Sequence, residues 1–369
     1  PWADQTTYLD HASIGPLPER TRRTCDDMNR RRARPFELGH EFLYGTLAAA
    51  RVEAAALIGA DPAEIALTTN TSFGLGMAAR ALPFSPGDVV LASDREFPAN
   101  VYPWKRLADR GVALELVPCT AEGWPDEKRL VARLADPRVR CLAVSLTQFA
   151  NGYTVDLARL SAETRSRGQF LVVDAIQALG QIPVDVAATP VDVLACGGQK
   201  WLLSPWGSGF VYVRRDLVQS LDPVITGWMA FEGTDDFTRL TEYREALRPD
   251  ARRFELISLP FQDFAGMVQS IRLLRELGVA SIQTHLAILR LPILEWAERR
   301  GVPVTSPGGP AASGIICVAP PRLEESFKAL RASRVVCGIR EGGIRLSPHC
   351  YNTIDEMQRV AALLDQSLG

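Results

Sequence analysis

Two hydrophobic patterns divide the chain. From about residue 16 to 60, apolar residues recur every three or four positions, as in EFLYGTLAAARVEAAALIG, and this spacing predicts helices. Short β-branched runs then recur, with helical stretches between most of them. Seven candidate strands result, at 64–68, 88–93, 113–118, 140–146, 170–175, 191–197 and 209–214. Strands that alternate with helices predict a βα-type sheet.

Several of these runs are apolar on both alternating faces, which indicates a sheet covered by helices on both sides. The segment 156–168, DLARLSAETRSRG, fits one of the crossover helices that parallel strands require. The pattern therefore predicts an α/β fold, with a three-layer α/β/α large domain around a mostly parallel seven-stranded sheet.

After residue 215 the pattern changes. The stretch 227–255 is polar and aromatic, and we interpret it as an excursion near a site or a subunit contact. Helices are then expected at about 261–277, 280–299, 322–332 and 353–367, separated by short apolar runs, which predicts a smaller α+β domain. We expect residues 16–255 to form the large domain, and residues 1–15 together with 256–369 to form the small one.

Composition narrows the classes of protein. The 369 residues are 47% hydrophobic and 23% charged, with a formal net charge of −2. This balance predicts no nucleic-acid partner, and no stretch approaches the roughly 18 apolar residues of a membrane helix. The seven cysteines are scattered without a C-x-x-C pair, and the four histidines are dispersed. We therefore expect no metal, no disulfide framework and a cytoplasmic location.

Lysine is rare in this chain. Of the 41 basic residues, the lysines are Lys105, Lys128, Lys200 and Lys328. Lys200 lies in GGQKWLLSPWGSGF, between glycines and an apolar flank, just past the strand expected at 191–197. Because the chain uses arginine wherever a surface cation suffices, a lysine in this setting indicates amine chemistry.

Other chemistry-bearing residues follow neighbouring strands. In open α/β sheets, ligands bind beyond the carboxyl ends of the strands. The strand at 64–68 precedes TNTSFGLG, whose backbone N–H groups, hydroxyls and helix dipole can hold a phosphate, and Asp174 ends the strand at 170–175. An amine, a strand-end carboxylate and a phosphate cradle are the groups that pyridoxal 5′-phosphate (PLP) requires.

Together, and in this order, these segments resemble the PLP-dependent class V aminotransferase-fold family, which includes cysteine desulfurases, kynureninase and isopenicillin N epimerase-like enzymes. The resemblance begins at YLDHASIGPLP (8–18) and continues through VVDAIQALG and GGQKWLLSPWGSGFVYVR. It ends with RRFELIS (252–258) and GIRLSPHCYNT (343–353). It implies an aspartate aminotransferase-like fold, an amino-acid substrate and a homodimer with shared active sites.

The resemblance also implies a role for each matching residue. Lys200 would form the Schiff base with PLP, and Asp174 would pair with the pyridinium nitrogen. The other cofactor-binding positions are Thr71 and Ser72 in the phosphate turn, Phe97 stacked on the ring, Gln148 and Gln177 near the ring oxygen, Gln199 before the lysine, and Ser258 donated by the partner subunit. Arg345, with Gln148 and Arg340, matches the substrate-binding positions, where a guanidinium binds a carboxylate bidentately.

Two positions depart from the family pattern. The residue before the Schiff-base lysine is commonly His, and here it is Gln199, whose amide can still donate a hydrogen bond to a phosphate. Cysteine desulfurases carry a nucleophilic Cys on a loop between two arginines. Here Arg340 and Arg345 are separated only by Glu341-Gly342-Gly343-Ile344, and Cys337 and Cys350 lie outside that interval. Persulfide chemistry is therefore disfavoured.

The residues predict a mechanism in outline. Asp174 would keep the pyridine nitrogen protonated, and Lys200 would move a proton at the substrate Cα. An aminotransferase or epimerase-like reaction ranks first, and a C–S β-lyase or cysteine desulfurase-like reaction is the alternative. Two readings from other classes stay open: a nicotinamide-dependent oxidoreductase that uses the G-x-G-x-x-A turn at 74–79 with Asp94, and a non-enzymatic PLP-binding protein.

Overall fold

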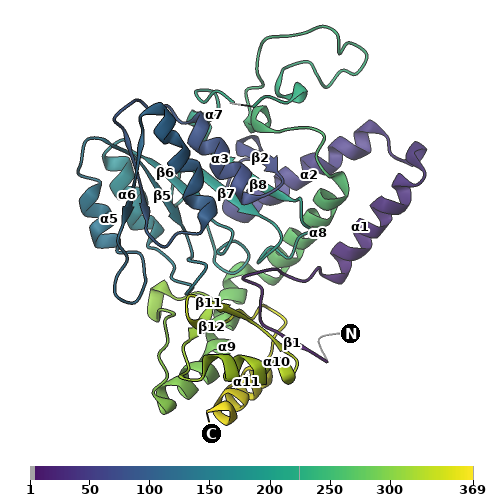
Figure 1. The fold of residues 1–369 in the computed structure, drawn as a ribbon. Coiled ribbons are helices and arrows are strands. Elements are labelled where there is room, and N and C mark those ends of the chain that lie inside the picture. The colour runs from purple at the N-terminus through teal and green to yellow at the C-terminus, as the bar shows by residue number, and fades with distance from the viewer. Residues whose placement is uncertain (1–4, 224, 369) are drawn as a thin grey trace.

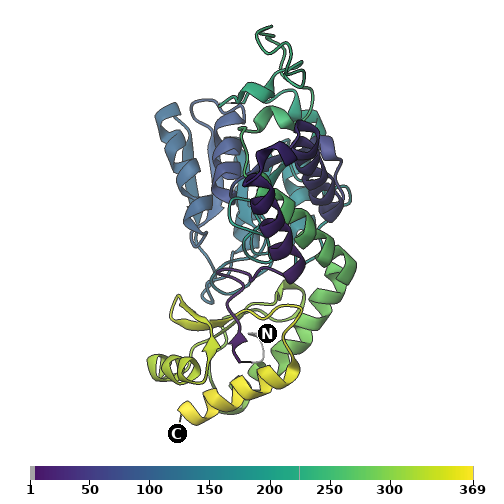
Figure 2. The ribbon, with the colours of Figure 1, turned by 90° about the vertical axis from the view of Figure 1, so that its right-hand side faces the viewer.

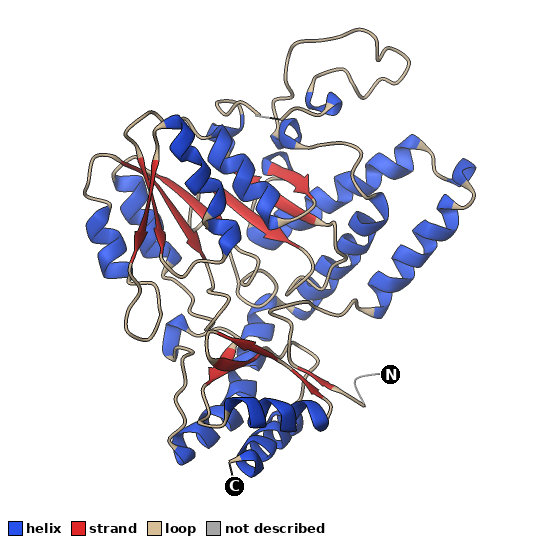
Figure 3. Cartoon of the chain, in the orientation of Figure 1, coloured by secondary structure: helices blue, strands red, loops and turns tan. Residues whose placement is uncertain are grey.

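The central feature of the computed structural model, which describes residues 5–223 and 225–368, is a seven-stranded sheet with the order β2-β8-β7-β6-β5-β3-β4 (Figures 1 and 3). Pairing among β4, β3, β5, β6 and β7 is parallel, whereas β8 runs antiparallel to β7 and β2. The strands are β2 (Ile65–Thr68), β3 (Val89–Ser93), β4 (Ala113–Val117), β5 (Val139–Ser145), β6 (Phe170–Asp174), β7 (Val193–Gly197) and β8 (Gly209–Val213). Each of the seven runs expected from the sequence is one of these strands.

The sheet separates two hydrophobic cores. Alternate residues of one strand enter different cores, since Leu142 and Val144 of β5 belong to one cluster and Cys141 and Ala143 to the other. Side chains in a strand point alternately to its two faces, so the two clusters are the two faces of the sheet. This confirms the expectation of a sheet that is covered on both sides.

Helices form the two outer layers. The first core contains buried side chains of α2 (His40–Ile58), α5 (Glu127–Arg133), α6 (Leu157–Ser166) and α8 (Phe261–Leu277). The second contains those of α3 (Thr71–Ala81) and α4 (Tyr102–Lys105). The helix α1 (Glu19–Arg32) packs on α8, and α7 (Arg215–Val218) follows β8. The three-layer α/β/α arrangement is therefore as predicted.

The G-x-G-x-x-A sequence has a packing role. Gly74 lies inside α3, not in a turn before it, and a Cβ there would lie 2.4 Å from Val211 Cγ2 and 2.8 Å from the Ala195 Cβ. Glycine thus lets α3 approach β7 and β8 closely. This placement removes the basis of the nicotinamide interpretation, because a dinucleotide-binding turn must precede its helix.

A smaller unit lies below the large body in Figure 1. Its three-stranded sheet has the order β11-β12-β9, formed by β9 (Ile316–Val318), β11 (Gly338–Arg340) and β12 (Gly343–Leu346). The N-terminal strand β1 (Thr7–Tyr8) pairs with β10 (Val335–Val336) in parallel. The helices of this unit are α9 (Val279–Arg300), α10 (Leu323–Ala332) and α11 (Ile354–Ser367). Residues near both ends of the chain therefore meet in one unit.

The helices α8 and α9 lead from the large body to the small unit (Figure 2). Because α8 packs against α1 and α2, it belongs with the large body. The next helix, α9, packs on α11 of the small unit. Much of the polar aromatic stretch 227–255 lies in the long loop at the top of Figure 1, whereas its last part, Ala251–Phe254, packs on β2.

Among the helices of residues 5–223 and 225–368, no single one is both long and apolar enough to cross a bilayer; the pair α8 and α9, bent by 73°, has the length and composition only when taken together.

Candidate active site

Lys200 follows β7 and lies at the carboxyl edge of the sheet. Its Nζ is 5.5 Å from the centroid of the Phe97 ring. Burial, with smaller contributions from Arg345 and Arg340, lowers the pKa of this amine from 10.5 to about 8, and Asp174 acts in the opposite direction. Lys200 is therefore a lysine that can lose its proton near neutral pH, as an imine-forming amine requires.

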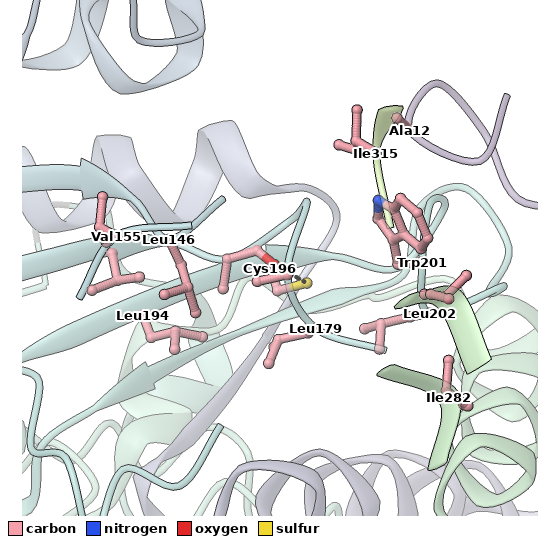
Figure 4. Close-up of a cluster of buried hydrophobic side chains, with 14 of the residues drawn as sticks. Ala12, Leu146, Val155, Leu179, Leu194, Cys196, Trp201, Leu202, Ile282 and Ile315 are labelled. Atoms are coloured by element: carbon pink, nitrogen blue, oxygen red, sulfur yellow. Dashed lines mark hydrogen bonds between the residues drawn. The ribbon is translucent and has the colours of Figure 1, made fainter. Parts of the chain in front are cut away.

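The backbone around Lys200 is held on both sides. Gly15 N donates to Gln199 O at 2.8 Å, and a Cβ on Gly15 would lie 2.2 Å from Lys200 O, so only glycine fits there. On the other side, the fully buried Trp201 lies beside Ala12 and Ile315, with Leu202 and Ile282 nearby (Figure 4). The lysine is thus anchored by the N-terminal segment and by the small unit.

Asp174 ends β6 and is paired in register with Ser145 of β5 and Ala195 of β7. Its carboxylate accepts a hydrogen bond from Ile176 N at 3.0 Å. Burial raises the pKa of Asp174 to about 6, which the Ile176 N–H and Lys200 oppose. A cationic partner such as a pyridinium would favour the ionised form of this carboxylate.

The expected phosphate turn is the start of α3. Asn70 caps the helix, its side chain accepting from Phe73 N, and Thr71 Oγ1 accepts from Gly197 N at 2.8 Å. A Cβ on Gly197 would lie 2.6 Å from Gln199 Oε1 and 3.2 Å from Thr71 Oγ1, so Gln199 and Thr71 meet over this glycine. The first N–H groups of a helix lack intrahelical partners and attract anions.

Arg345 is almost fully buried on β12. Its Nη1 donates to Phe149 O at 2.8 Å, and its Nη2 donates to Asp10 at 3.2 Å and to Ser13 Oγ at 2.6 Å. Its Nε has no hydrogen-bond partner among the described residues. A buried N–H without a partner is costly, so a substrate carboxylate would satisfy it.

Arg340 lies close to Arg345, and its Nη2 also donates to Ser13 Oγ, at 3.2 Å. It lines a cavity of about 320 Å³ together with Gln148, Phe149, Cys317 and Glu341. The edge of Phe97 meets the ring of Phe149, with the centroids 5.2 Å apart. The structure therefore brings Lys200, Phe97, Gln148 and both arginines to one place.

Three of the sequence-predicted positions do not line this cavity. Both polar atoms of the Gln177 amide bind protein groups: Nε2 donates to Ala12 O at 2.9 Å, and Oε1 accepts from Trp201 Nε1 at 2.8 Å. Ser258 is exposed and lines a cavity with Met28 and Arg32, whereas Ser72 lines a different groove with Met77 and Phe254.

Three residues of this site were not predicted individually from the sequence. Asp10 and Ser13 hold Arg345, and Glu96 binds Gln148. Asp10 and Ser13 belong to a segment recognised only as lying near the site. Glu96 precedes Phe97 in REFPAN, where a carboxylate after an apolar strand was the available signal.

The residues present fit PLP. The structure supplies a half-buried amine of lowered pKa facing Phe97, a strand-end carboxylate and a capped helix start, and the buried Nε of Arg345 has no acceptor among the described residues. In the part of the chain that is described, no group of three or more His, Cys, Asp or Glu side chains is arranged to hold a metal ion.

Comparison with known proteins identifies the class. The family model described as aminotransferase class-V matches residues 7–319, most of the chain. The chain belongs to this family; it is an enzyme of the PLP-dependent transferase fold, and PLP is its cofactor. The non-enzymatic interpretation is therefore excluded.

The chain is similar to proteins with different names. It is 30% identical to an uncharacterised aminotransferase of Bacillus subtilis, an alignment that covers 84% of this chain and 80% of that one. It is 28% identical to the isopenicillin N epimerase of Streptomyces clavuligerus, over 98% and 94% of the chains. Among solved structures, an apo cysteine desulfurase of Thermococcus onnurineus superimposes with a TM-score of 0.87 at 22% identity, over 99% and 95%. At that identity the last likeness shows the fold alone.

The lowered pKa of Lys200 predicts how cofactor attachment depends on pH. The neutral amine attacks the aldehyde, so the attachment rate should rise with pH and level off above about 8, whereas an ordinary lysine would require about 10.5. At pH 7, roughly one amine in ten is neutral, against roughly one in 3,000 for an ordinary lysine. Stopped-flow absorbance of the bound cofactor between pH 6 and 10 measures this rate.

A free aliphatic amine mixed with PLP at each pH corrects for the ionisation of PLP itself. Lys200→Ala should give no protein-bound band. An attachment rate that keeps rising to pH 10 without levelling off would show that the amine is not perturbed.

Proposed function

We propose that this enzyme acts at the Cα of an amino-acid substrate, as an aminotransferase or an epimerase-like enzyme. The observation that carries the proposal is the placement of Lys200, a base with a pKa of about 8, beside Asp174 and Phe97. Arg345 is also near, and its buried Nε has no partner among the described residues, so it can bind a carboxylate. Binding a substrate by its α-carboxylate at Arg345 would present its Cα to this amine.

Each of these residues has a distinct task in the proposed reaction. Bound PLP supplies an electron sink for the bond that breaks at Cα. Lys200 Nζ removes and returns a proton at Cα, and its lowered pKa lets it do both near neutral pH. Asp174 presents its carboxylate, at the end of β6, to the pyridine nitrogen. Arg345 fixes the orientation of the substrate through its carboxylate.

The second candidate is a C–S β-lyase or cysteine desulfurase-like reaction, which begins with the same proton removal and adds a leaving group on Cβ. The persulfide route has little support in this chain. Arg340 and Arg345 lie on the tightly connected strands β11 and β12, where Glu341 and Gly342 form the turn in place of a cysteine-bearing loop.

The nearby thiols are poor nucleophiles. Burial raises the pKa of Cys337 to about 12 and that of Cys350 to about 11, and it also raises the pKa of Cys317, which lines the cavity beside Arg340. A thiol attacks as its thiolate, so burial makes each of these groups a weaker nucleophile than an exposed cysteine. These observations favour Cα–H chemistry over persulfide formation.

Hydrogen exchange at Cα tests the proposal directly. Amino acids that change the spectrum of the holoenzyme should exchange their Cα hydrogen in deuterated water, and Lys200→Ala should abolish the exchange because the base is lost. Nuclear magnetic resonance follows the exchange, while parallel assays detect keto acid, the opposite enantiomer and sulfide.

Keto acid or the opposite enantiomer identifies the first candidate. Sulfide released from cysteine by the Cys337→Ala plus Cys350→Ala variant would replace it with β-elimination. Sulfide release that is lost with either thiol would restore the desulfurase mechanism, and a Cys317→Ala variant extends this test to the thiol in the cavity.

Arg345→Lys should weaken amino-acid binding by about 2–5 kcal/mol, because a lysine cannot reproduce the buried fork that would pair with the carboxylate. The absorption band of bound PLP should persist. Spectral titration with the responding amino acid measures the dissociation constant in each variant.

Arg253→Lys is the matched control, since Arg253 is also buried with a partnerless Nε among the described residues but donates to Val218 O, in the second core. Equal affinity of the parent enzyme for an amino acid and its amide would contradict the role of Arg345.

We also propose a homodimer with shared active sites. The groove beside Ser72 has a volume of about 410 Å³ and is lined by Phe73, Met77, Ile225 and Phe254. Ile225 is 62% exposed, and Trp228 on the adjoining loop is 42% exposed. A second copy would cover this apolar surface and bring its own Ser258 to the phosphate turn.

Subunit mixing tests the shared site. Lys200→Ala subunits should bind no PLP covalently, and Ser258→Ala subunits should bind it weakly. A mixed dimer contains one site with both Lys200 and Ser258, so unfolding and refolding the two variants together should restore tight binding at one site. Absorbance titration gives the stoichiometry, and sedimentation equilibrium gives the mass. A monomer that binds PLP as tightly as the parent would contradict the proposal.

A cytoplasmic location completes the proposal. Its support is that the seven cysteines are all free thiols, as is usual for proteins of a reducing compartment.

A further inference from the structure

A buried carboxylate outside the predicted site residues organises the loop after β3. Glu96 is 6% exposed and accepts hydrogen bonds from Ser145 N at 2.9 Å, Gln148 Nε2 at 2.8 Å and Asn100 Nδ2 at 3.2 Å, and also from the Ser145 hydroxyl. Four donors converge on one carboxylate, and together they satisfy both of its oxygens.

These donors come from the elements that surround Lys200. Ser145 ends β5 and is the register partner of Asp174 on β6. Gln148 follows β5 and lines the cavity next to Arg340. Phe97, whose ring faces Lys200, is the next residue after Glu96. The carboxylate of Glu96 thus connects the loop that carries Phe97 to the strand ends that carry Ser145 and Asp174.

The network is anchored at its far end. Asn100 Oδ1 accepts from Nε1 of the fully buried Trp104 at 3.1 Å, so the amide that donates to Glu96 is itself held in the second core. The backbone of Gln148 is fixed too, because its N–H donates to Tyr153 O and its carbonyl accepts from Gly152 N. What Glu96 adds is the orientation of the Gln148 side chain.

We infer that Glu96 is a positioning residue, whose carboxylate aims the Gln148 amide and the Phe97 ring at the bound cofactor. One N–H of Gln148 Nε2 is directed to Glu96, and no other described residue hydrogen-bonds the side-chain amide, so its second N–H and its Oε1 can contact a ligand. The inference rests on the proposed site geometry, and it holds whether the reaction is transamination, epimerisation or elimination.

If Glu96 only stabilised the fold, its replacement would act like the replacement of any other buried carboxylate and would not change cofactor binding. The chain offers such a case for comparison: Glu53 of α2 is also 6% exposed and pairs with Arg272 and Arg275 of α8, away from the cavity. Glu53→Gln and Glu96→Gln therefore remove the same charge from equally buried sites, and only the second should disturb the cofactor.

The test is the binding of PLP without substrate. Glu96→Gln places an amide N–H group among donors, so Gln148 and Phe97 should lose their fixed orientation. We expect the dissociation constant of PLP to rise at least 10-fold and the induced circular dichroism of the bound cofactor to fall. Glu53→Gln should leave both unchanged, even where it lowers the thermal unfolding midpoint.

A double-mutant cycle with Gln148→Ala tests the route of the effect. If Glu96 acts through Gln148, the double variant weakens PLP binding by less than the product of the two single effects. Should Glu96→Gln fail to fold, Glu96→Asp withdraws the same carboxylate by one methylene and should show the same change to a smaller degree.

Parent affinity and parent dichroism in a folded Glu96 variant would overturn the inference, as would effects of Glu96 and Gln148 that multiply independently. Because no substrate is present, a failed prediction about the reaction leaves this result intact, and a failure here leaves the reaction assays unaffected.

Discussion

The structure depends on the removal of a few charged groups from water at one edge of the sheet. Lys200, Asp174, Glu96 and Arg345 all lie where strands and loops of the two units meet, and burial opposes ionisation of each. Isolated buried charges are expensive, so the fold must supply partners or shift the proton equilibria. Glu96 accepts hydrogen bonds on both oxygens, whereas Lys200 has a lowered pKa and the Arg345 Nε has no hydrogen-bond partner in the described part of the chain. In the proposed reaction, two of these incompletely compensated groups, Lys200 and Arg345, would act on the substrate.

The N-terminal segment supplies much of the remaining compensation. Asp10 and Ser13 hold Arg345, and Gly15 lies against the backbone of Lys200. His11 donates through Nδ1 to Ser347 O, so its Nε2 accepts from the Tyr351 hydroxyl. Because this segment also pairs with β10 of the small unit, the arginine that would bind substrate and the lysine that would perform chemistry share one support.

The sequence was sufficient for the scaffold because local patterns encode it. The seven strands could be predicted because each is an apolar run in the sequence. Lys200 and Asp174 could be singled out because residues of their type are unusual near the ends of buried strands. The sequence did not predict the roles of Glu96, Asp10 and Ser13, because these residues act on partners that lie far away in the chain. Ser13, for example, accepts a hydrogen bond from Arg345. The motif around Gly74 was visible in the sequence, but its meaning was not. Only the close approach of Val211 and Ala195 shows that glycine is required there for packing.

The connection between β11 and β12 bears most directly on the reaction. A nucleophilic thiol must reach the substrate as a thiolate, which requires a mobile and solvated loop. Here a two-residue turn, with Glu341 in the left-handed region, carries the chain straight back into β12, and Cys317 is buried against Gly343 on the neighbouring strands. The same register holds Arg340 at the cavity and Arg345 beneath Ser13. The small sheet thus presents two fixed cations in place of a mobile nucleophile, an arrangement suited to the carboxylate binding and Lys200-assisted proton transfer that we propose.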